Sequence, residues 1–345
     1  DNCPYSLPGL KHKGKHALGS WRGGTGCACR LVNVNNSKMA PVAQPWAGKP
    51  AKLIGSNMSG MRYEAPGSVD EAVTLLADAN GAARVLAGGT DLLVQLRAGM
   101  ISPDVVVNIK NISETQGIAA DGGGFCIGAS VAGAEMGENA ALKAAWPGVV
   151  EGAELIGSTQ VQGRATMAGN LCNASPAADS VPALIAAGAT CTVAGPNGQR
   201  EVSVSDIPTG PGQTSLGNGE FVVNIKLPAR PANASDAYLR MIPRTEMDIA
   251  IVGAAVNLVL DGDGTCTEAS VVLGAVGPKT ITVADAAAAL VGSKVDDAAL
   301  AAVSAACSAA ATPIDDKRGT VAYRTKVAGV MAARAAAIAA ERARS

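Results

Sequence analysis

Histidine is almost missing from this sequence, which has two in 345 residues, His12 and His16. From Met61 onward, histidine is therefore excluded as a general base, as a member of a Ser-His-Asp triad and as a metal ligand. The eight cysteines lack zinc or iron–sulfur spacing, and the five that follow residue 60 indicate reduced thiols of a cytoplasmic protein. If this chain takes part in redox chemistry, a cofactor must carry it.

Aromatic residues are also scarce, at 3% of the chain, although 48% of the residues are hydrophobic. The core must therefore be built mainly from Ala, Val, Leu and Ile. No apolar run is long enough to span a bilayer, and none resembles a signal peptide. The length is sufficient for two or three domains with a sizeable core.

Charge is distributed unevenly between residues 1–60 and the remainder. The first segment holds eight basic residues and one acid, which leaves 20 basic and 28 acidic residues in 61–345, a net charge of −8. A segment of that sign is a poor candidate for binding nucleic acid or an anionic membrane surface. Residues 1–60 are either a disordered basic leader or translated sequence upstream of a start at Met61, and we favour the second interpretation.

A glycine-rich turn at residues 84–99 is the first candidate for a binding site. Val85 to Ala87 are typical of a short buried strand, and Asp91 to Ala98 of a helix with Leu92, Leu93 and Leu96 on its apolar side. A strand that passes through glycines into a helix leaves backbone N–H groups unpaired, and these favour an anion such as a phosphate or diphosphate. The alternative is an ordinary connector between a strand and a helix.

Residues 157–179 form the second candidate, a polar stretch rich in Ser, Thr, Asn, Gln and Gly without a hydrophobic period. Such a long loop inside a compact domain usually has a function, and its hydroxyls, amides and N–H groups could line a polar ligand. A surface meander is the alternative.

The remaining pattern predicts an α+β protein. A capping box at Ser68–Glu71 opens a helix to about Ala79, and with two strands it makes a small α/β layer at 61–115. After a linker at 231–236 we expect three strands and then helices at 283–291, 296–311 and 321–343. The basic residues of the last helix are expected on a solvated face: Arg324, Lys326, Arg334, Arg342 and Arg344.

Three passages together resemble one family: Leu86-Ala-Gly-Gly-Thr-Asp-Leu-Leu93, Ala165-Thr-Met-Ala-Gly-Asn-Leu-Cys-Asn-Ala-Ser-Pro-Ala-Ala-Asp179 and Ile242-Pro-Arg-Thr-Glu-Met-Asp-Ile-Ala250. From Met61 to its end, the chain resembles the FAD-binding medium subunit of the molybdenum hydroxylases, the xanthine dehydrogenase and aerobic carbon monoxide dehydrogenase family. The resemblance implies a two-subdomain FAD-binding fold of the vanillyl-alcohol oxidase (PCMH) type at 61–232, with subdomains of about 61–115 and 116–232. A C-terminal α+β domain with an antiparallel sheet and helices would follow at 236–345.

By the same resemblance, the first loop would hold the FAD diphosphate, the second would complete the site, and Arg240 would lie near the flavin. The implied cofactor-binding residues are Val85, Leu86, Ala87, Gly88, Gly89, Thr90, Asp91, Leu92, Ile156, Thr166, Gly169, Asn170, Asp179, Val222 and Arg240. For Arg240 the residues alone also allow a surface charge at a strand end.

Two positions depart from the family pattern. Ala168 stands where a second glycine is usual, and its methyl group would crowd the cofactor if the backbone there needed a positive φ. Gln162-Gly163 replaces the commoner Arg-Asn pair. The tripeptide after Gly88-Gly89 also differs from the one usual in the carbon monoxide enzymes, which disfavours carbon monoxide as the substrate.

The resemblance implies an electron-transfer subunit without catalytic side chains or metal of its own. Molybdopterin would be bound by a large partner and two [2Fe–2S] clusters by a small partner, in a dimer of heterotrimers, and electrons would leave FAD for NAD, a quinone or oxygen. Two alternatives stay open: a flavin-free scaffold that assists assembly, and a stand-alone NADPH-dependent flavin reductase of the same fold.

Overall fold

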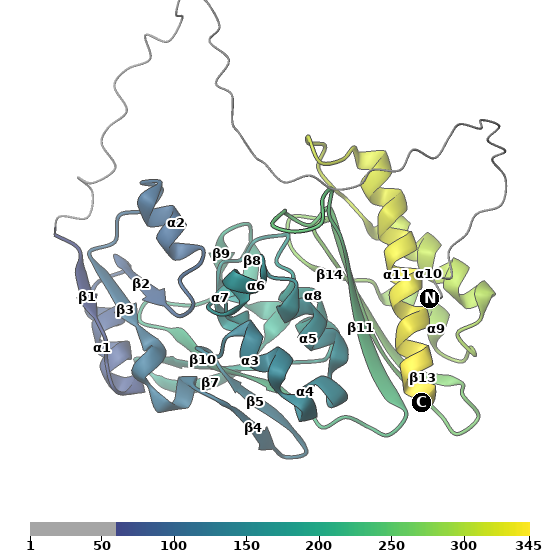
Figure 1. Cartoon of the computed structure of the whole chain (residues 1–345), viewed down its shortest axis with the longest axis horizontal. Coiled ribbons are helices and arrows are strands. Elements are labelled where there is room, and N and C mark those ends of the chain that lie inside the picture. Colours follow the sequence, from purple (N-terminus) through teal and green to yellow (C-terminus); the bar gives the residue numbers. More distant parts are fainter. Residues whose placement is uncertain (1–59) are drawn as a thin grey trace, which may run out of the picture. The chain divides into compact units, whose positions relative to one another are not determined.

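The computed structural model describes residues 60–345, so the two interpretations of residues 1–59 lie outside it. The first part of this range, which we call the N-terminal lobe, runs from β1 to the short 3₁₀ helices η1 (Ile109–Asn111) and η2 (Ser113–Thr115). Its strands form a parallel sheet in the order β1-β3-β2 (Figure 1). The lobe contains β1 (Arg62–Glu64), α1 (Val69–Asp78), β2 (Ala83–Leu86), α2 (Leu92–Arg97) and β3 (Val105–Asn108).

The start of α1 confirms the Ser68 half of the predicted capping box, whereas the reciprocal bond of Glu71 comes from the residue before the cap. The Ser68 hydroxyl accepts a hydrogen bond from the Glu71 N–H at 3.3 Å, and the Glu71 carboxylate accepts one from the Gly67 N–H at 3.0 Å. In α2 the predicted apolar face is wrong for Leu93, which is 49% exposed, because a six-residue helix at the edge of the lobe buries Leu96 alone.

The middle lobe, from β4 to β10, packs a row of helices against an antiparallel sheet in the order β4-β5-β10-β6-β7 (Figure 1). Its strands are β4 (Ile118–Asp121), β5 (Gly124–Gly128), β6 (Thr190–Gly195), β7 (Gly198–Ser203), β8 (Pro208–Gly210), β9 (Gln213–Thr214) and β10 (Phe221–Leu227). Its helices are α3 (Gly133–Glu138), α4 (Ala140–Ala145), α5 (Pro147–Glu154), α6 (Thr159–Gln162), α7 (Met167–Cys172), α8 (Ser180–Ala186) and the 3₁₀ helix η3 (Val204–Asp206).

Residues 157–179 are not the continuous loop that the pattern predicts, because they contain α6 and α7. The Thr166 hydroxyl caps α7 by accepting a hydrogen bond from the Gly169 N–H at 2.9 Å. Both helices are of six residues or fewer. Segments that short show no hydrophobic period in the sequence.

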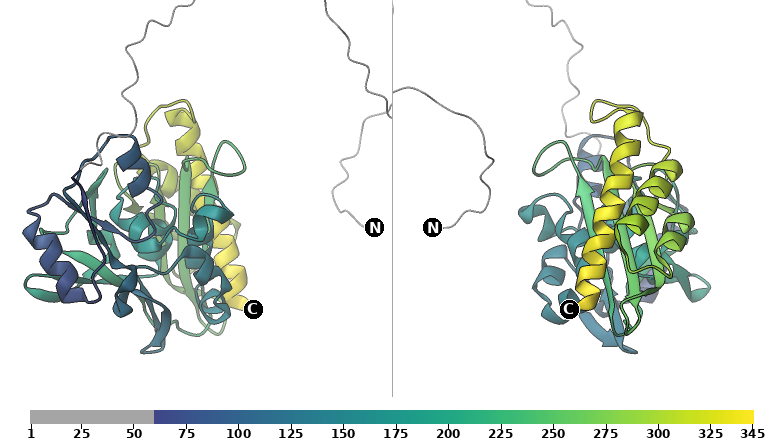
Figure 2. Two further views of the ribbon diagram at one scale, coloured as in Figure 1. Left: turned by 60° about the vertical axis from the view of Figure 1, so that its left-hand side comes forward. Right: turned by 90° about the vertical axis from the view of Figure 1, so that its right-hand side faces the viewer.

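The C-terminal lobe, from β11 to α11, has an antiparallel sheet in the order β11-β12-β13-β14. Its elements are β11 (Ala234–Met241), β12 (Val252–Leu260), β13 (Cys266–Gly274), β14 (Ile281–Thr282), α9 (Ala284–Leu290), α10 (Asp297–Ala310) and α11 (Val321–Arg344). Helices α9 to α11 cover one side of this sheet, whereas α5 and α8 of the middle lobe lie on the other (Figures 1 and 2).

Small residues give the C-terminal lobe its close packing, as the scarcity of aromatics requires. Seven alanines of α11 are buried in the core of this lobe: Ala328, Ala332, Ala335, Ala336, Ala339, Ala340 and Ala343. A Cβ atom on Gly329 would lie 2.3 Å from the Ser304 carbonyl oxygen, so α10 and α11 touch backbone to backbone there.

The outer edge of β11 is covered by α5 rather than left open. The Tyr238 N–H donates to the Glu151 carboxylate at 2.9 Å, and the Asp236 carboxylate accepts a hydrogen bond from the Val149 N–H at 3.0 Å. Arg342 of α11 donates to the Asp236 carbonyl at 2.9 Å and pairs with Glu151. The prediction of a solvated basic face on α11 is therefore wrong for Arg342, which ties this helix to the seam between the lobes.

Candidate functional site

A cavity of about 980 Å³ lies between the N-terminal and middle lobes. This volume is at the upper end of the roughly 300–1,000 Å³ typical of ligand pockets, which suits a ligand as long as a dinucleotide. Twelve of the fifteen residues predicted from the sequence line it: Val85, Ala87, Gly88, Gly89, Thr90, Asp91, Leu92, Ile156, Thr166, Gly169, Asn170 and Val222. The fold thus brings the two candidate loops, far apart in the sequence, to one cavity.

The two glycines of the first loop meet different requirements. A Cβ atom on Gly88 would lie 2.1 Å from the Arg164 carbonyl oxygen, so a side chain there is excluded by the second loop. The sequence had suggested that a ligand approaches this glycine closely, whereas the structure places protein backbone against Gly88. Gly89 has φ +78°, a left-handed conformation that favours glycine.

The first loop offers a run of free hydrogen-bond donors. Among residues 60–345, the N–H groups of Gly88, Gly89, Thr90 and Asp91 find no acceptor. The Asp91 side chain makes no capping bond to α2 either. Gly88, Gly89 and Thr90 are half-buried and Asp91 is exposed, and all four line the cavity. Consecutive backbone donors of this kind can form a concave site for an anion.

The second loop is held in place by its own polar side chains. Asn170 accepts hydrogen bonds from the Ser180 hydroxyl at 2.8 Å and the Ser180 N–H at 3.2 Å. Asn173 accepts a bond from the Gln95 amide of α2 at 3.1 Å, which joins the two loops beside the cavity. Ala168 lies inside α7 and is not among the residues of positive φ, so its methyl group needs no strained backbone.

Leu86, Asp179 and Arg240 do not line the cavity. Arg240 donates to the Asp179 carboxylate at 2.9 Å and to the Leu155 carbonyl at 2.6 Å, and the Tyr238 hydroxyl donates to Asp179 at 3.2 Å. The Arg240 side chain is 4% exposed, so the alternative of a surface charge is wrong. Burial raises the pKa of Asp179 to about 6, although the charge of Arg240 and the hydrogen bonds from Arg240 and Tyr238 oppose the shift.

Sequence reasoning missed the wall contributed by residues 212–221. This wall consists of Gly212, Thr214, Leu216, Gly217, Asn218, Gly219, Glu220 and Phe221. The Asn218 amide donates to the Ala77 carbonyl at 3.2 Å and so joins the two lobes at this end of the cavity. Residues 212–221 are as polar as residues 157–179 and equally lack a hydrophobic period. This similarity is the signal from which the sequence could have predicted their place in the site.

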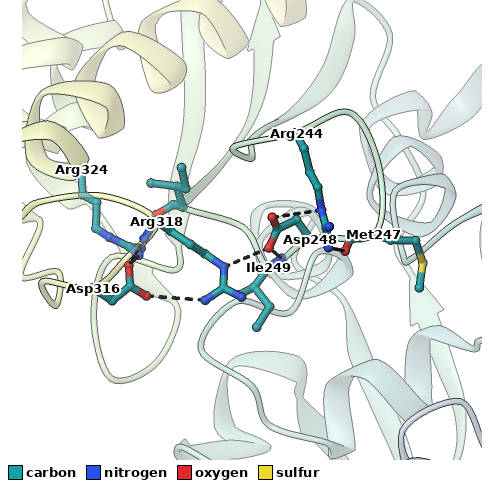
Figure 3. A network of polar contacts seen from close by, with 8 residues as sticks. Arg244, Met247, Asp248, Ile249, Asp316, Arg318 and Arg324 are labelled. Atoms are coloured by element: carbon teal, nitrogen blue, oxygen red, sulfur yellow. Dashed lines mark hydrogen bonds and ion pairs between the residues drawn. The ribbon is translucent and has the colours of Figure 1, made fainter. Parts of the chain in front are cut away.

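The third passage of the resemblance, Ile242 to Ala250, joins β11 to β12 and also lies outside the cavity wall. Figure 3 shows the ion pairs that hold it to the segment before α11. Asp248 pairs with Arg318 at 2.9 Å and with Arg244 at 3.2 Å, and Arg318 reaches Asp316 at 3.7 Å. The hydrogen bond from Arg318 is the largest effect that lowers the pKa of Asp248.

No group of three or more metal-ligating side chains occurs within residues 60–345. In the same range no helix combines the length and apolarity that crossing a bilayer requires. The five cysteines after residue 60 are free thiols, as predicted.

Comparison with known proteins places the chain in a family. Residues 57–230 match the FAD binding domain in molybdopterin dehydrogenase, and residues 237–339 match the CO dehydrogenase flavoprotein C-terminal domain. The chain belongs to the FAD-binding subunits of the molybdenum hydroxylases. As a member of this family it is the FAD-binding subunit of an oxidoreductase, with the PCMH-type α+β fold that the resemblance implied.

Relatives of this FAD-binding subunit include the carbon monoxide dehydrogenase medium chain of Afipia carboxidovorans, 33% identical over 79% of this chain and 94% of that one. The xanthine dehydrogenase FAD-binding subunit of Escherichia coli O157:H7 is 32% identical over 64% of this chain and 75% of its own length. Among solved structures, reconstituted CO dehydrogenase from Oligotropha carboxidovorans has a chain that is 32% identical, with a TM-score of 0.78, covering 82% of this chain and 98% of that one. Quinoline 2-oxidoreductase from Pseudomonas putida 86 gives a TM-score of 0.75 at 28% identity, with the same coverage.

The described residues fit FAD as the cofactor of this subunit. The acceptor-free N–H groups at 88–91 suit a diphosphate, and the same cavity is also lined by the apolar Ile156 and Val222 and by the wall at residues 212–221. When bound, FAD supplies the redox chemistry that the side chains of this site lack.

Proposed function

We propose that this chain carries electrons within a molybdopterin-dependent hydroxylase or dehydrogenase, from [2Fe–2S] clusters of a small partner subunit to an external acceptor. The observation that carries the proposal is the run of N–H donors without acceptors in the wall of a dinucleotide-sized cavity. The family membership supports it, since several relatives are named as medium chains or FAD subunits of dehydrogenases.

In this proposal the molybdopterin belongs to a large partner subunit, and the complex is a dimer of heterotrimers in the cytoplasm. The acceptor is NAD, a quinone or oxygen. Relatives at nearly equal identity are named for carbon monoxide and xanthine, so identity alone favours neither substrate. The substrate would be set by the large subunit.

We further propose that the twelve predicted residues lining the cavity contact FAD, with Gly88 to Asp91 at the diphosphate. For Asp179 and Arg240 we propose an indirect role in place of direct contact. Their ion pair fixes the end of the second loop against β11 of the C-terminal lobe, together with the hydrogen bond from the Ala275 N–H to the Pro176 carbonyl at 2.8 Å. We also propose residues 61–232 and 236–345 as the two domains.

The first test is an absorption spectrum of the purified chain, with the cofactor released and identified. We expect the oxidised flavin bands at roughly 370 and 450 nm and release of FAD. A second step adds the partner subunits and substrate and follows bleaching of the 450 nm band.

Each alternative function predicts a different result. A colourless protein that refuses added FAD would support the flavin-free scaffold. Bleaching by NADPH in the absence of any partner would support the stand-alone reductase. Bleaching that requires substrate and both partners would support the electron-transfer subunit.

A further inference from the structure

The Lys110 side chain and the backbone of Arg164 both lie against the Ala87–Gly88 segment of the first loop. The Lys110 ammonium donates a hydrogen bond to the Ala87 carbonyl at 3.0 Å. On the neighbouring residue, the backbone of Arg164 lies so close to Gly88 that a Cβ atom would have no room. Lys110 is not among the residues that line the cavity, so its ammonium reaches the Ala87 carbonyl from behind the cavity wall.

Lys110 is aimed at this peptide by fixed neighbours. The Asn108 side chain accepts a hydrogen bond from the Lys110 N–H at 3.1 Å, and the Gln116 amide donates to the Lys110 carbonyl at 2.6 Å. Asn108 is itself held by a 2.6 Å bond to the Tyr63 hydroxyl. These bonds fix the backbone from which the Lys110 side chain extends to the Ala87 carbonyl.

The two cations lack a counter-charge. Neither Lys110 nor Arg164 forms a salt bridge with any acid in residues 60–345, although acids outnumber bases after residue 60. Partial burial and the positive charge of Arg164 both lower the pKa of Lys110. Like charges held together without a partner are unfavourable, and an anion bound nearby would relieve the repulsion.

Peptide geometry tells on which side that anion would bind. The C=O and N–H groups of a trans peptide point in opposite directions, and the chain has no cis peptide in its described residues. Lys110 occupies the carbonyl side of the Ala87–Gly88 peptide, so the Gly88 N–H points the other way. A cation on the carbonyl polarises the peptide and strengthens the N–H as a donor.

We propose that Lys110 is a positioning residue for the diphosphate of FAD: it acts through the Ala87–Gly88 peptide and supplies a positive charge from behind the loop. This inference rests on the proposed placement of the diphosphate at Gly88 to Asp91. It adds Lys110, which lies in neither candidate loop, and it explains why this ammonium has no acidic partner within residues 60–345 although acids outnumber bases there.

The test compares the full-length variants Lys110→Met and Lys110→Arg after removal of flavin. The dissociation constants of FAD and ADP are measured between about 50 and 300 mM salt. We expect Lys110→Met to weaken both ligands by about 10- to 100-fold, the range for a lost charged hydrogen bond, and to flatten the salt dependence. Lys110→Arg keeps the charge and should stay within a few-fold of wild type.

Lys226→Met is the matched control, because Lys226 pairs with Glu201 and lies outside the cavity wall. Thermal unfolding of each flavin-free variant separates positioning from support of the fold. Unchanged FAD and ADP affinity in Lys110→Met would overturn the inference while leaving the proposed function intact. So would weaker binding with an unaltered salt dependence and a lower melting temperature, since this indicates a purely structural lysine. A wild-type chain that binds ADP but not FAD would instead contradict the proposed function.

Discussion

Gly88 and Gly89 are adjacent, yet substitutions at the two positions should destabilise the loop for different reasons. A methyl group on Gly88 would meet the Arg164 carbonyl at 2.1 Å, so Gly88→Ala must push the two loops apart. We expect a loss of about 1–3 kcal/mol in unfolding free energy and at least a tenfold loss of FAD affinity. Urea unfolding and flavin titration measure the two effects.

Gly67→Ala is the matched control, because nothing lies within 4 Å of its added methyl group and its φ is not positive. It should change neither quantity measurably. If Gly88→Ala behaved like this control, the backbone contact between the loops would be unimportant for binding FAD.

The buried carboxyl group of Asp179 should make the stability of the protein depend on pH. Its folded-state pKa of about 6 exceeds the ordinary value of 3.8, so the folded state binds this proton more tightly than the unfolded state. The contribution of Asp179 to stability is therefore greatest below about pH 4 and is lost as the pH rises towards 6. We expect the unfolding free energy of wild type minus that of Asp179→Asn to fall by about 2–3 kcal/mol across this window.

Urea unfolding at several values between pH 4 and 8 measures this difference. Asp206→Asn, which removes an exposed carboxylate, serves as the control and should give a curve parallel to wild type. A parallel curve for Asp179→Asn as well would show that the buried carboxyl titrates normally.

At the scale of elements, the sequence predicted whatever is governed by local chemistry. The Ser68 cap of α1 and the three C-terminal helices follow from signals within a few residues. The short helix α7 was missed because six residues do not span two hydrophobic periods. The cavity wall at 212–221 was missed because tertiary contacts such as Asn218 with Ala77 place it.

Helix α11 shows how tertiary context overrides a correct helix prediction. Arg324 was expected in solvent but is 3% exposed; it donates to the Ile251 carbonyl at 3.0 Å and to Asp316 at 2.6 Å. The Asp316–Arg318 turn brings this acid to the helix, as Figure 3 shows. Periodicity cannot reveal that a basic residue has an acidic partner eight positions earlier.

Truncating Arg324 should therefore destabilise the C-terminal lobe. We expect Arg324→Ala to cost about 2–4 kcal/mol of unfolding free energy, because the Ile251 carbonyl and Asp316 lose their donor. Arg334→Ala, at an exposed position of the same helix, should stay within about 0.5 kcal/mol. Equal effects in denaturant titrations would mean that the contacts of the buried Arg324 side chain contribute nothing to stability.

At the scale of the molecule, the flavin cavity depends on a lobe that does not line it. The N-terminal and middle lobes form the cavity wall, whereas the C-terminal lobe supplies Tyr238 and Arg240, which hold Asp179 behind the second loop. The seam between α5, β11 and α11 carries this support. No local pattern reveals such a seam, since its partners are up to 191 positions apart.

The seam predicts energetic coupling between Glu151 of the middle lobe and Arg342 of the C-terminal lobe. Glu151 accepts the Tyr238 N–H with one carboxylate oxygen and pairs with Arg342 through the other, while Arg342 also binds the Asp236 carbonyl. Because both side chains are about one-third exposed, we expect a coupling energy of about 1–2 kcal/mol in a double-mutant cycle of Glu151→Ala and Arg342→Ala.

The exposed pair Lys143–Glu154 provides the comparison, because it joins α4 and α5 inside the middle lobe and should couple by less than about 0.5 kcal/mol. Flavin titration of the same variants extends the test to function. If the seam positions the second loop through β11, the Glu151 and Arg342 variants should bind FAD more weakly, whereas the Lys143 and Glu154 variants should not. Coupling no larger than in the surface pair, with unchanged FAD affinity, would mean that the C-terminal lobe supports the cavity by packing alone.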